Sequence, residues 1–150
     1  MDFLRVDVLT EVVIRRPLAE VADYAIDPGN APEWYSNIVR VEWEKPGPLD
    51  VGSRLAFMAR FLGRTLAYTY EIVELVPRER LVMRTAEGPF PMEATYTWAA
   101  EGPDSTRMSL RNRGEPSGFG GVAAPAMSLA MRRANTKDLS TLRSLLEHKL

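Results

Sequence analysis

The chain has 150 residues, 45% of them hydrophobic and 26% charged, with a formal net charge of −1. This length is typical of one domain with a core of its own, so we expect a single domain over residues 1–150. The sequence has no cysteine and one histidine, which excludes disulfides, thiolate metal sites, iron–sulfur clusters and multi-histidine metal centres. The balanced charge argues against the broad positive field that nucleic-acid binding needs.

The start of the sequence and its hydropathy favour a soluble cytoplasmic protein. Residues 3–8 alternate and lack the basic start and apolar run of a signal peptide. No window approaches the about 18 uncharged apolar residues of a membrane-spanning helix. We therefore expect no integral membrane segment, no metal and no cofactor.

The first elements predicted along the chain are one strand and two helices. The strand covers Leu4–Arg15 and ends in the β-branched run at positions 12–14. Pro17 suits the first turn of a helix, which Asp27-Pro28 would end. The apolar stripe of this helix consists of Leu18, Val21, Ala22, Ala25 and Ile26. A short second helix is predicted through residues 33–35.

Six further strands are predicted in the middle of the chain, because a period of two is interrupted by glycine and proline. They cover residues 37–43, 53–61, 65–75, 80–86, 92–100 and 106–113. Gly63-Arg64 would join the second and third of these into a hairpin. The short connections favour antiparallel neighbours throughout.

The last 30 residues change to the period of a long amphipathic helix, which we expect to begin between Phe119 and Ala126. Its apolar face carries Ala124, Met127, Met131, Leu139, Leu142, Leu145 and Leu146. Two polar residues, Asn135 and Asp138, fall within this face. A buried carboxylate is costly unless it is paired or hydrogen-bonded. We favour an Asp138 that sits at an edge of this face or pairs with an arginine, such as that at 107, 111 or 113. The alternative is that the helix leaves a polar spot that a ligand can reach.

Together these elements predict an α+β fold, with the long helix laid across one face of a curved antiparallel sheet of seven strands. His148 lies outside the apolar face of that helix, so we expect it in solvent without a catalytic role. Glu71 and Glu93 are isolated carboxylates with no predicted partner. No phosphate loop, dinucleotide fingerprint or nucleophile elbow occurs.

Several predicted strands carry apolar or aromatic side chains on both faces. Tyr68 and Tyr70 share one face of their strand, and Tyr96 and Trp98 share one face of theirs. This pattern fits an ordinary core, and it also fits an apolar cavity in which a few polar groups orient a ligand. From the pattern alone, the ordinary core is favoured.

Several motifs along the chain are informative together. They are VIRRPLAEV at 13–21, DPGNAPEW at 27–34, EIVELVPRERL at 71–81 and RRANTKDL at 132–139, with Gly52-Ser53 and Gly88-Pro89-Phe90. These motifs resemble the START-like (SRPBCC) superfamily, and most closely its polyketide cyclase/dehydrase-like branch. The resemblance implies a helix-grip fold, in which the seven-stranded sheet curves around the C-terminal helix and encloses an apolar cavity. It covers nearly the whole chain.

The resemblance favours the cavity over the ordinary core and implies that the concave sheet face and the first part of the last helix line it. The candidate ligand-binding residues are Trp34, Phe57, Tyr68, Tyr70, Met83, Phe90, Tyr96, Met108, Asn112, Met127, Met131 and Asn135. Because the branch has no fixed catalytic signature, no catalytic residue carries over to this chain.

Three functions are compatible with the sequence. The first is binding of a small, largely hydrophobic ligand, such as a lipid, a polyketide or an aromatic metabolite. The second is a cyclase or dehydrase, in which Tyr68, Tyr70, Tyr96 or Asp138 would move protons and at least two such groups must converge in the cavity. The third is an interaction protein that docks a partner, such as a second copy, through the sheet or the segment Phe119–Ala126. The shortage of imidazole and thiol groups favours binding.

Overall fold

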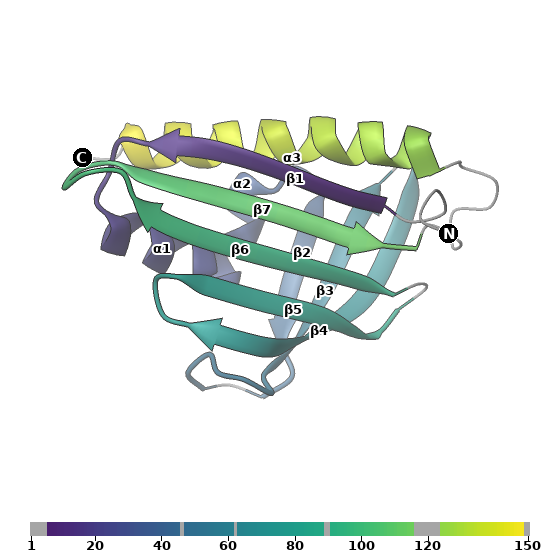
Figure 1. Ribbon diagram of the computed structural model, residues 1–150. Helices are drawn as coiled ribbons and strands as arrows, with labels where there is room; N and C mark the ends of the chain where they lie inside the picture. Colours follow the sequence, from purple (N-terminus) through teal and green to yellow (C-terminus); the bar gives the residue numbers. More distant parts are fainter. Residues whose placement is uncertain (1–5, 46, 62, 89–90, 116–123, 149–150) are drawn as a thin grey trace.

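The computed structural model describes residues 6–45, 47–61, 63–88, 91–115 and 124–148 (Figure 1). Its elements follow in the order β1 (Val6–Ile14), α1 (Leu18–Ile26), the 3-10 turn η2 (Pro28–Asn30), α2 (Ala31–Trp34), β2 (Ile38–Trp43), β3 (Arg54–Phe61), β4 (Arg64–Val76), β5 (Arg80–Glu87), β6 (Met92–Ala100), β7 (Thr106–Gly114) and α3 (Ala124–Glu147). The element order predicted from the sequence is confirmed, with boundaries that differ by a few residues.

The seven strands form one antiparallel sheet in the order β1-β7-β6-β5-β4-β3-β2. The register shifts in the β2–β3 and β4–β5 pairs, and such irregularities bend a sheet. The sheet curves so that β2 and β3 lie behind β5–β7, and α3 runs along β1 at its open side (Figure 1). The predicted α+β helix-grip architecture is therefore confirmed.

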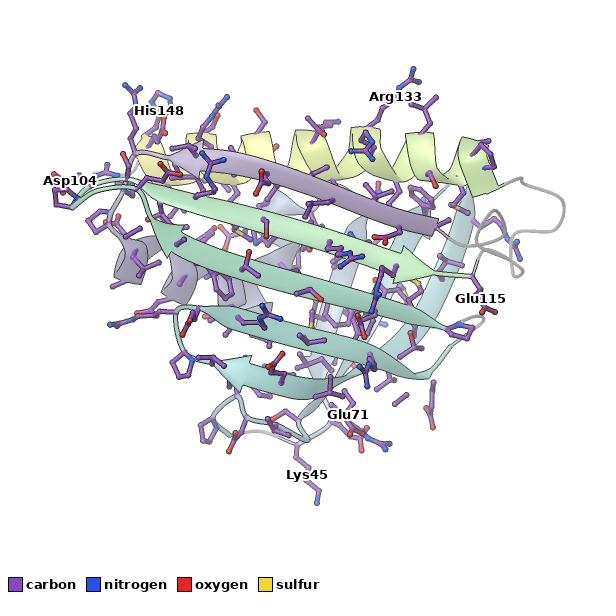
Figure 2. The ribbon with its side chains drawn as sticks, in the orientation of Figure 1. Lys45, Glu71, Asp104, Glu115, Arg133 and His148 are labelled. Carbon is purple, nitrogen blue, oxygen red and sulfur yellow. The ribbon has the colours of Figure 1, made fainter. Side chains whose placement is uncertain are left out.

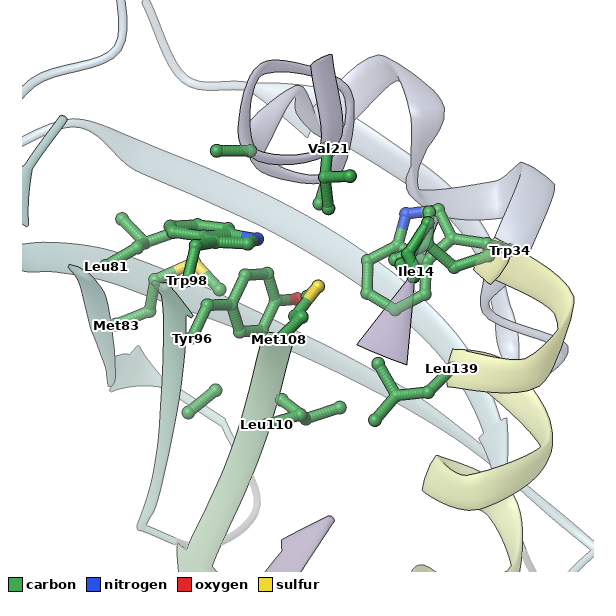
Figure 3. Close-up of a cluster of buried hydrophobic side chains, with 14 of the residues drawn as sticks. Ile14, Val21, Trp34, Leu81, Met83, Tyr96, Trp98, Met108, Leu110 and Leu139 are labelled. Atoms are coloured by element: carbon green, nitrogen blue, oxygen red, sulfur yellow. The ribbon is translucent and has the colours of Figure 1, made fainter. Parts of the chain in front are cut away.

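The main hydrophobic core lies beneath the C-terminal half of α3. Leu139, Leu142 and Leu146 are almost fully buried there, together with residues of α1 and of the sheet. In Figure 3, Met108 and Leu110 of β7 lie near Leu139 of α3. A smaller cluster at the other end of the helix joins Val6, Val8, Leu66 and Met127. The two halves of α3 therefore pack against different surroundings.

Two details of the predicted helix faces can be compared with the structure. Leu145 was expected on the apolar face of α3, but 38% of it is exposed. It sits at the margin of that face, about 60° from Leu142. His148 is exposed as expected, and Figure 2 shows it on the outer side of α3, away from the sheet.

Glu71 and Glu93, for which the sequence predicted no partner, both form ion pairs in the structure. The strand register places Arg54 opposite Glu71, and their side chains approach to 3.1 Å (Nε to Oε1). Glu93 lies opposite both Arg84 and Arg113, at 2.7 Å from Arg84 Nε and 2.6 Å from Arg113 Nη2. Directly opposite residues form the ion pairs of a sheet, and these pairs depend on a register that the sequence does not display.

Within the ranges that the structure describes, no group of His, Cys, Asp and Glu side chains is placed to hold a metal ion. Over the same ranges, no helix combines the length and apolar character needed to cross a membrane.

Candidate functional site

A cavity of about 110 Å³ separates the N-terminal half of α3 from the concave face of the sheet. A single water needs about 10–15 Å³, so the side chains leave room for more than one small molecule of that size. The wall is formed by the strands β1–β7, the turn between α2 and β2, and α3. Glu115, just past the end of β7, belongs to the wall and is exposed, so the cavity opens to solvent at this end of β7 (Figure 2 labels Glu115).

Most of the residues predicted to contact a ligand meet at this cavity. The predicted residues that line it are Phe57, Tyr68, Tyr70, Met83, Tyr96, Asn112, Met127, Met131 and Asn135. Trp34 and Met108 do not line it, and Phe90 lies outside the described residues. The alternation along each strand thus placed these side chains on the concave face.

Trp34 and Met108 instead belong to the main core, with exposures of 1% and 0%. Met108 shares a face of β7 with Asn112 but lies four residues nearer the end that the C-terminal half of α3 covers. At about 3.3 Å per residue, that separation is about 13 Å along the strand. Trp34 stacks on Tyr35, with ring centroids 4.0 Å apart, and Tyr35 is the residue that reaches the cavity.

Three aromatic rings make up a continuous wall on β3 and β4. Phe57 and Tyr68 stack with centroids 5.5 Å apart and an interplanar angle of 3°. Tyr70 packs edge-on against both, at 5.4 and 5.2 Å. Such stacked and edge-to-face contacts hold rings in place and present a large apolar surface.

Tyrosine hydroxyls supply much of the polar chemistry of the cavity. Tyr35 lies in the turn after α2 and Tyr96 lies on strand β6, and their hydroxyls hydrogen-bond to each other. Burial raises the pKa of both phenols, and it also raises the pKa of Tyr68 and Tyr70. All four groups therefore stay protonated at neutral pH and act as neutral O–H donors.

Asp138 brings a carboxylate to the same cavity from α3, with 1% of the residue exposed. Its Oδ1 accepts hydrogen bonds from the Ser36 backbone N at 3.1 Å and from the Ser36 Oγ at 3.0 Å. Burial raises the pKa of Asp138, and the two Ser36 hydrogen bonds oppose this shift.

The favoured interpretation, an edge position or an arginine partner for Asp138, was therefore wrong, because the residue is 1% exposed and its partner is Ser36. The arginines of β7 hydrogen-bond to other acids, with Arg111 on Asp7 and Arg113 on Glu93. They extend from the convex side of the sheet, because neighbouring residues of a strand point to opposite faces. Asp138 faces the concave side, where Ser36 lies.

Asn135 lies one helical turn before Asp138 and also lines the cavity. The residue is 5% exposed, and its Nδ2 has no hydrogen-bond partner among the described residues. A buried amide without a partner is unfavourable by about 1–3 kcal/mol, so this position is suited to a bound molecule that supplies the missing bond.

Sequence reasoning missed several residues of the site, of which Tyr35, Ser36 and Asn37 matter most for chemistry. Tyr35 and Asn37 line the cavity, and Ser36 holds Asp138. All three lie in the short connection between α2 and β2. The only available signal was a run of polar and aromatic residues directly after the helix, which does not reveal which element it faces.

Comparison with known proteins places this geometry in a family. The chain matches the family described as "Polyketide cyclase / dehydrase and lipid transport" over residues 5–147. The chain belongs to this family. The suspected superfamily membership is thereby confirmed. No curated protein matches the sequence significantly.

Solved structures of the family's fold are similar over nearly the full length. TTHA0849 from Thermus thermophilus is 22% identical with a TM-score of 0.78, over 93% of this chain and 96% of that one. The Zhui aromatase/cyclase from a Streptomyces species is 18% identical with a TM-score of 0.76, over 95% and 94%. A START superfamily protein from Mycobacterium smegmatis is 16% identical with a TM-score of 0.79, over 94% and 97%. At these identities the likeness establishes the fold.

Proposed function

We propose that this protein binds a small, largely hydrophobic ligand in the cavity between the sheet and α3. The observation that carries the proposal is an open cavity walled by aromatic and methionine side chains, with a few polar groups among them. Ligand sites usually combine an apolar wall with a small number of groups that fix orientation. The family fits both ligand binding and cyclase or dehydrase activity.

The dimensions of the cavity support a ligand at the small end of the predicted range of lipids, polyketides and aromatic metabolites. An enclosed cavity of about 150 Å³ binds benzene, and this one, at about 110 Å³, is smaller, so a single-ring ligand would extend toward the open rim. Burial of apolar ligand surface contributes about 25 cal/mol per Å². Methionines at 83, 92, 127 and 131 add walls that adapt their shape.

Native mass spectrometry of the freshly purified protein, together with thermal unfolding in the presence of toluene, tests this proposal. A ligand that binds only the native state raises the melting temperature, and a co-purified molecule adds its mass to the protein. Ala134→Leu is the matched control, because its larger side chain fills part of the cavity and should reduce the stabilisation by toluene. The proposal fails if toluene stabilises neither protein, or both equally.

A second function, cyclase or dehydrase chemistry, is supported by one specific observation. Three titratable groups meet in the cavity: the Asp138 carboxylate and the hydroxyls of Tyr68 and Tyr70. Asp138 is hydrogen-bonded to Ser36, whereas the two hydroxyls have no hydrogen-bond partner among the described residues. General acid–base catalysis requires such groups within reach of the substrate. Incubation with a linear poly-β-ketone, followed by chromatography and mass spectrometry, separates the two functions. A cyclase closes a ring by intramolecular aldol addition, which leaves the mass unchanged but gives a new compound, and loss of the resulting β-hydroxyl then releases water. A binding protein returns the linear chain.

Docking of a partner through the sheet surface or the segment Phe119–Ala126 stays a prediction. A homodimer also stays a prediction. Residues 119–123 of that segment lie outside the described residues. Light scattering coupled to gel filtration measures the mass in solution and decides between one copy and two.

A further inference from the structure

The charged groups of the cavity wall are unevenly placed. Of the described residues that line it, three are charged: Arg113, Glu115 and Asp138. Arg113 lies at the end of β7 with its side chain on the convex side of the sheet, where its Nη2 contacts Glu93 Oε1 at 2.6 Å. Of these three, Asp138 alone is buried, so the described part of the interior wall offers a negative group and no free cation.

One oxygen of the Asp138 carboxylate receives no hydrogen bond from the described residues, and it determines how the carboxylate acts on a ligand. Both hydrogen bonds from Ser36 reach Oδ1, and no described residue donates to Oδ2. A ligand carboxylate in this part of the cavity would meet a second carboxylate in a low-dielectric setting, where like charges repel strongly. An uncharged ligand meets no such repulsion.

The neutral polar groups of the wall, in contrast, offer hydrogen-bond donors that have no acceptor among the described residues. Tyr35 and Tyr96 share one hydrogen bond, which uses one of their two O–H protons and leaves the other free. Asn135 lies three residues before Asp138 on the same face of α3, with its Nδ2 unpartnered among the described residues and 5% of the residue exposed. A ligand that carries an acceptor oxygen without a charge would satisfy these donors.

We propose that Asn135 and Asp138 determine ligand specificity: the Asn135 amide hydrogen-bonds an uncharged ligand oxygen of the ketone type, and the Asp138 carboxylate excludes carboxylate ligands. This inference rests on the proposed binding function and adds the chemical class of the ligand. It assigns opposite roles to two side chains one turn apart on α3. Fatty acids and aromatic acids are thereby disfavoured relative to neutral oxygenated rings.

Three single-ring probes of similar size test the inference by NMR titration at about pH 8, where free carboxyl groups are ionised. Acetophenone carries a ketone, benzoate carries a carboxylate, and toluene carries no oxygen. We expect acetophenone to bind at least about tenfold more tightly than benzoate, with toluene between them. Toluene reports on the proposed binding function alone.

Two variants assign this selectivity to its residues. Asp138→Asn keeps a side-chain oxygen that accepts both Ser36 bonds, and we expect it to tighten benzoate binding about tenfold with acetophenone changed less than about threefold. Asn135→Leu replaces the amide by an apolar group of similar shape and should weaken acetophenone about fivefold while leaving toluene unchanged. Thr136→Val, on the exposed outer face of α3, is the control and should change none of the three.

The three probes separate failure of the inference from failure of the proposed function. Toluene binding combined with equal affinities for acetophenone and benzoate would overturn the inference and leave the proposed function intact. The inference is also overturned if Asp138→Asn remains folded, as judged by circular dichroism, and benzoate binding does not improve. Failure of all three probes to bind the wild-type protein would overturn the proposed function and this inference with it.

Discussion

Filling the cavity is expected to stabilise the protein. Ala134 lies on the α3 side of the cavity wall, so Ala134→Leu adds three carbons that extend into empty space. Each buried carbon contributes about 0.8 kcal/mol, and fixing a leucine side chain costs about 0.5–1 kcal/mol. We therefore expect the free energy of unfolding to rise by about 1–2 kcal/mol. For a chain of this length, each kcal/mol corresponds to about 2–4 °C in melting temperature.

The matched control is the same substitution in the close-packed core. Ala22 of α1 is 2% exposed and belongs to the main hydrophobic cluster. Overpacking such a site destabilises by about 1–3 kcal/mol, so Ala22→Leu should lower the free energy of unfolding. Urea unfolding followed by circular dichroism measures both variants. If Ala134→Leu destabilises as much as Ala22→Leu, the space beside Ala134 is packed in solution and the expected stabilisation is refuted.

Three further outcomes follow from the contacts described above. Leu142→Ala empties a fully buried site beneath α3 and should lower the free energy of unfolding by about 3–4 kcal/mol in urea titrations; a loss below about 1 kcal/mol would contradict the core assignment. Ser36→Ala removes one hydrogen bond to a buried carboxylate and should cost about 1.5 kcal/mol by the same assay, whereas Ser36→Thr keeps the hydroxyl and most of the stability.

Glu93→Gln, the last of the three, concerns acid stability. Hydrogen bonds from Arg84 and Arg113 lower the pKa of Glu93 below its ordinary value of 4.5, so the native state favours the charged form. This stabilisation, at most about 1 kcal/mol, is present above about pH 4.5 and is lost as the pH falls through the lowered pKa. The gap in melting temperature between wild type and variant should shrink on acidification, and a gap independent of pH would count against the ion pairs.

The secondary structure was predictable because local patterns carry it. Each strand shows a period of two between turn residues, and Gly63 provides the left-handed backbone, with φ of 75°, that the β3–β4 hairpin requires. The change to a helical period after residue 119 located α3 equally well. Alternation also identified which side of a strand faces inward, as Phe57, Tyr96 and Asn112 demonstrate.

The same patterns did not predict where along a strand the core ends and the cavity begins. Met108 and Asn112 have the same facing on β7, yet one lies in the core and the other at the cavity. That difference depends on where α3 approaches the sheet, which is a long-range property. The contact of Ser36 with Asp138 joins residues 102 positions apart, and no periodicity in either segment indicates it.

The most informative sequence signal was the pair of polar residues that interrupts the apolar face of α3. A helix that only covers a core gains from an uninterrupted apolar face, and two polar residues in that face are unfavourable unless something satisfies them. α3 has such a continuous face at Leu139, Leu142 and Leu146, where the core is dense. The polar pair Asn135 and Asp138 occurs where the helix leaves the core and passes over the cavity. The break in amphipathicity therefore marks the boundary between the half of the helix that packs on the core and the half that lines the cavity.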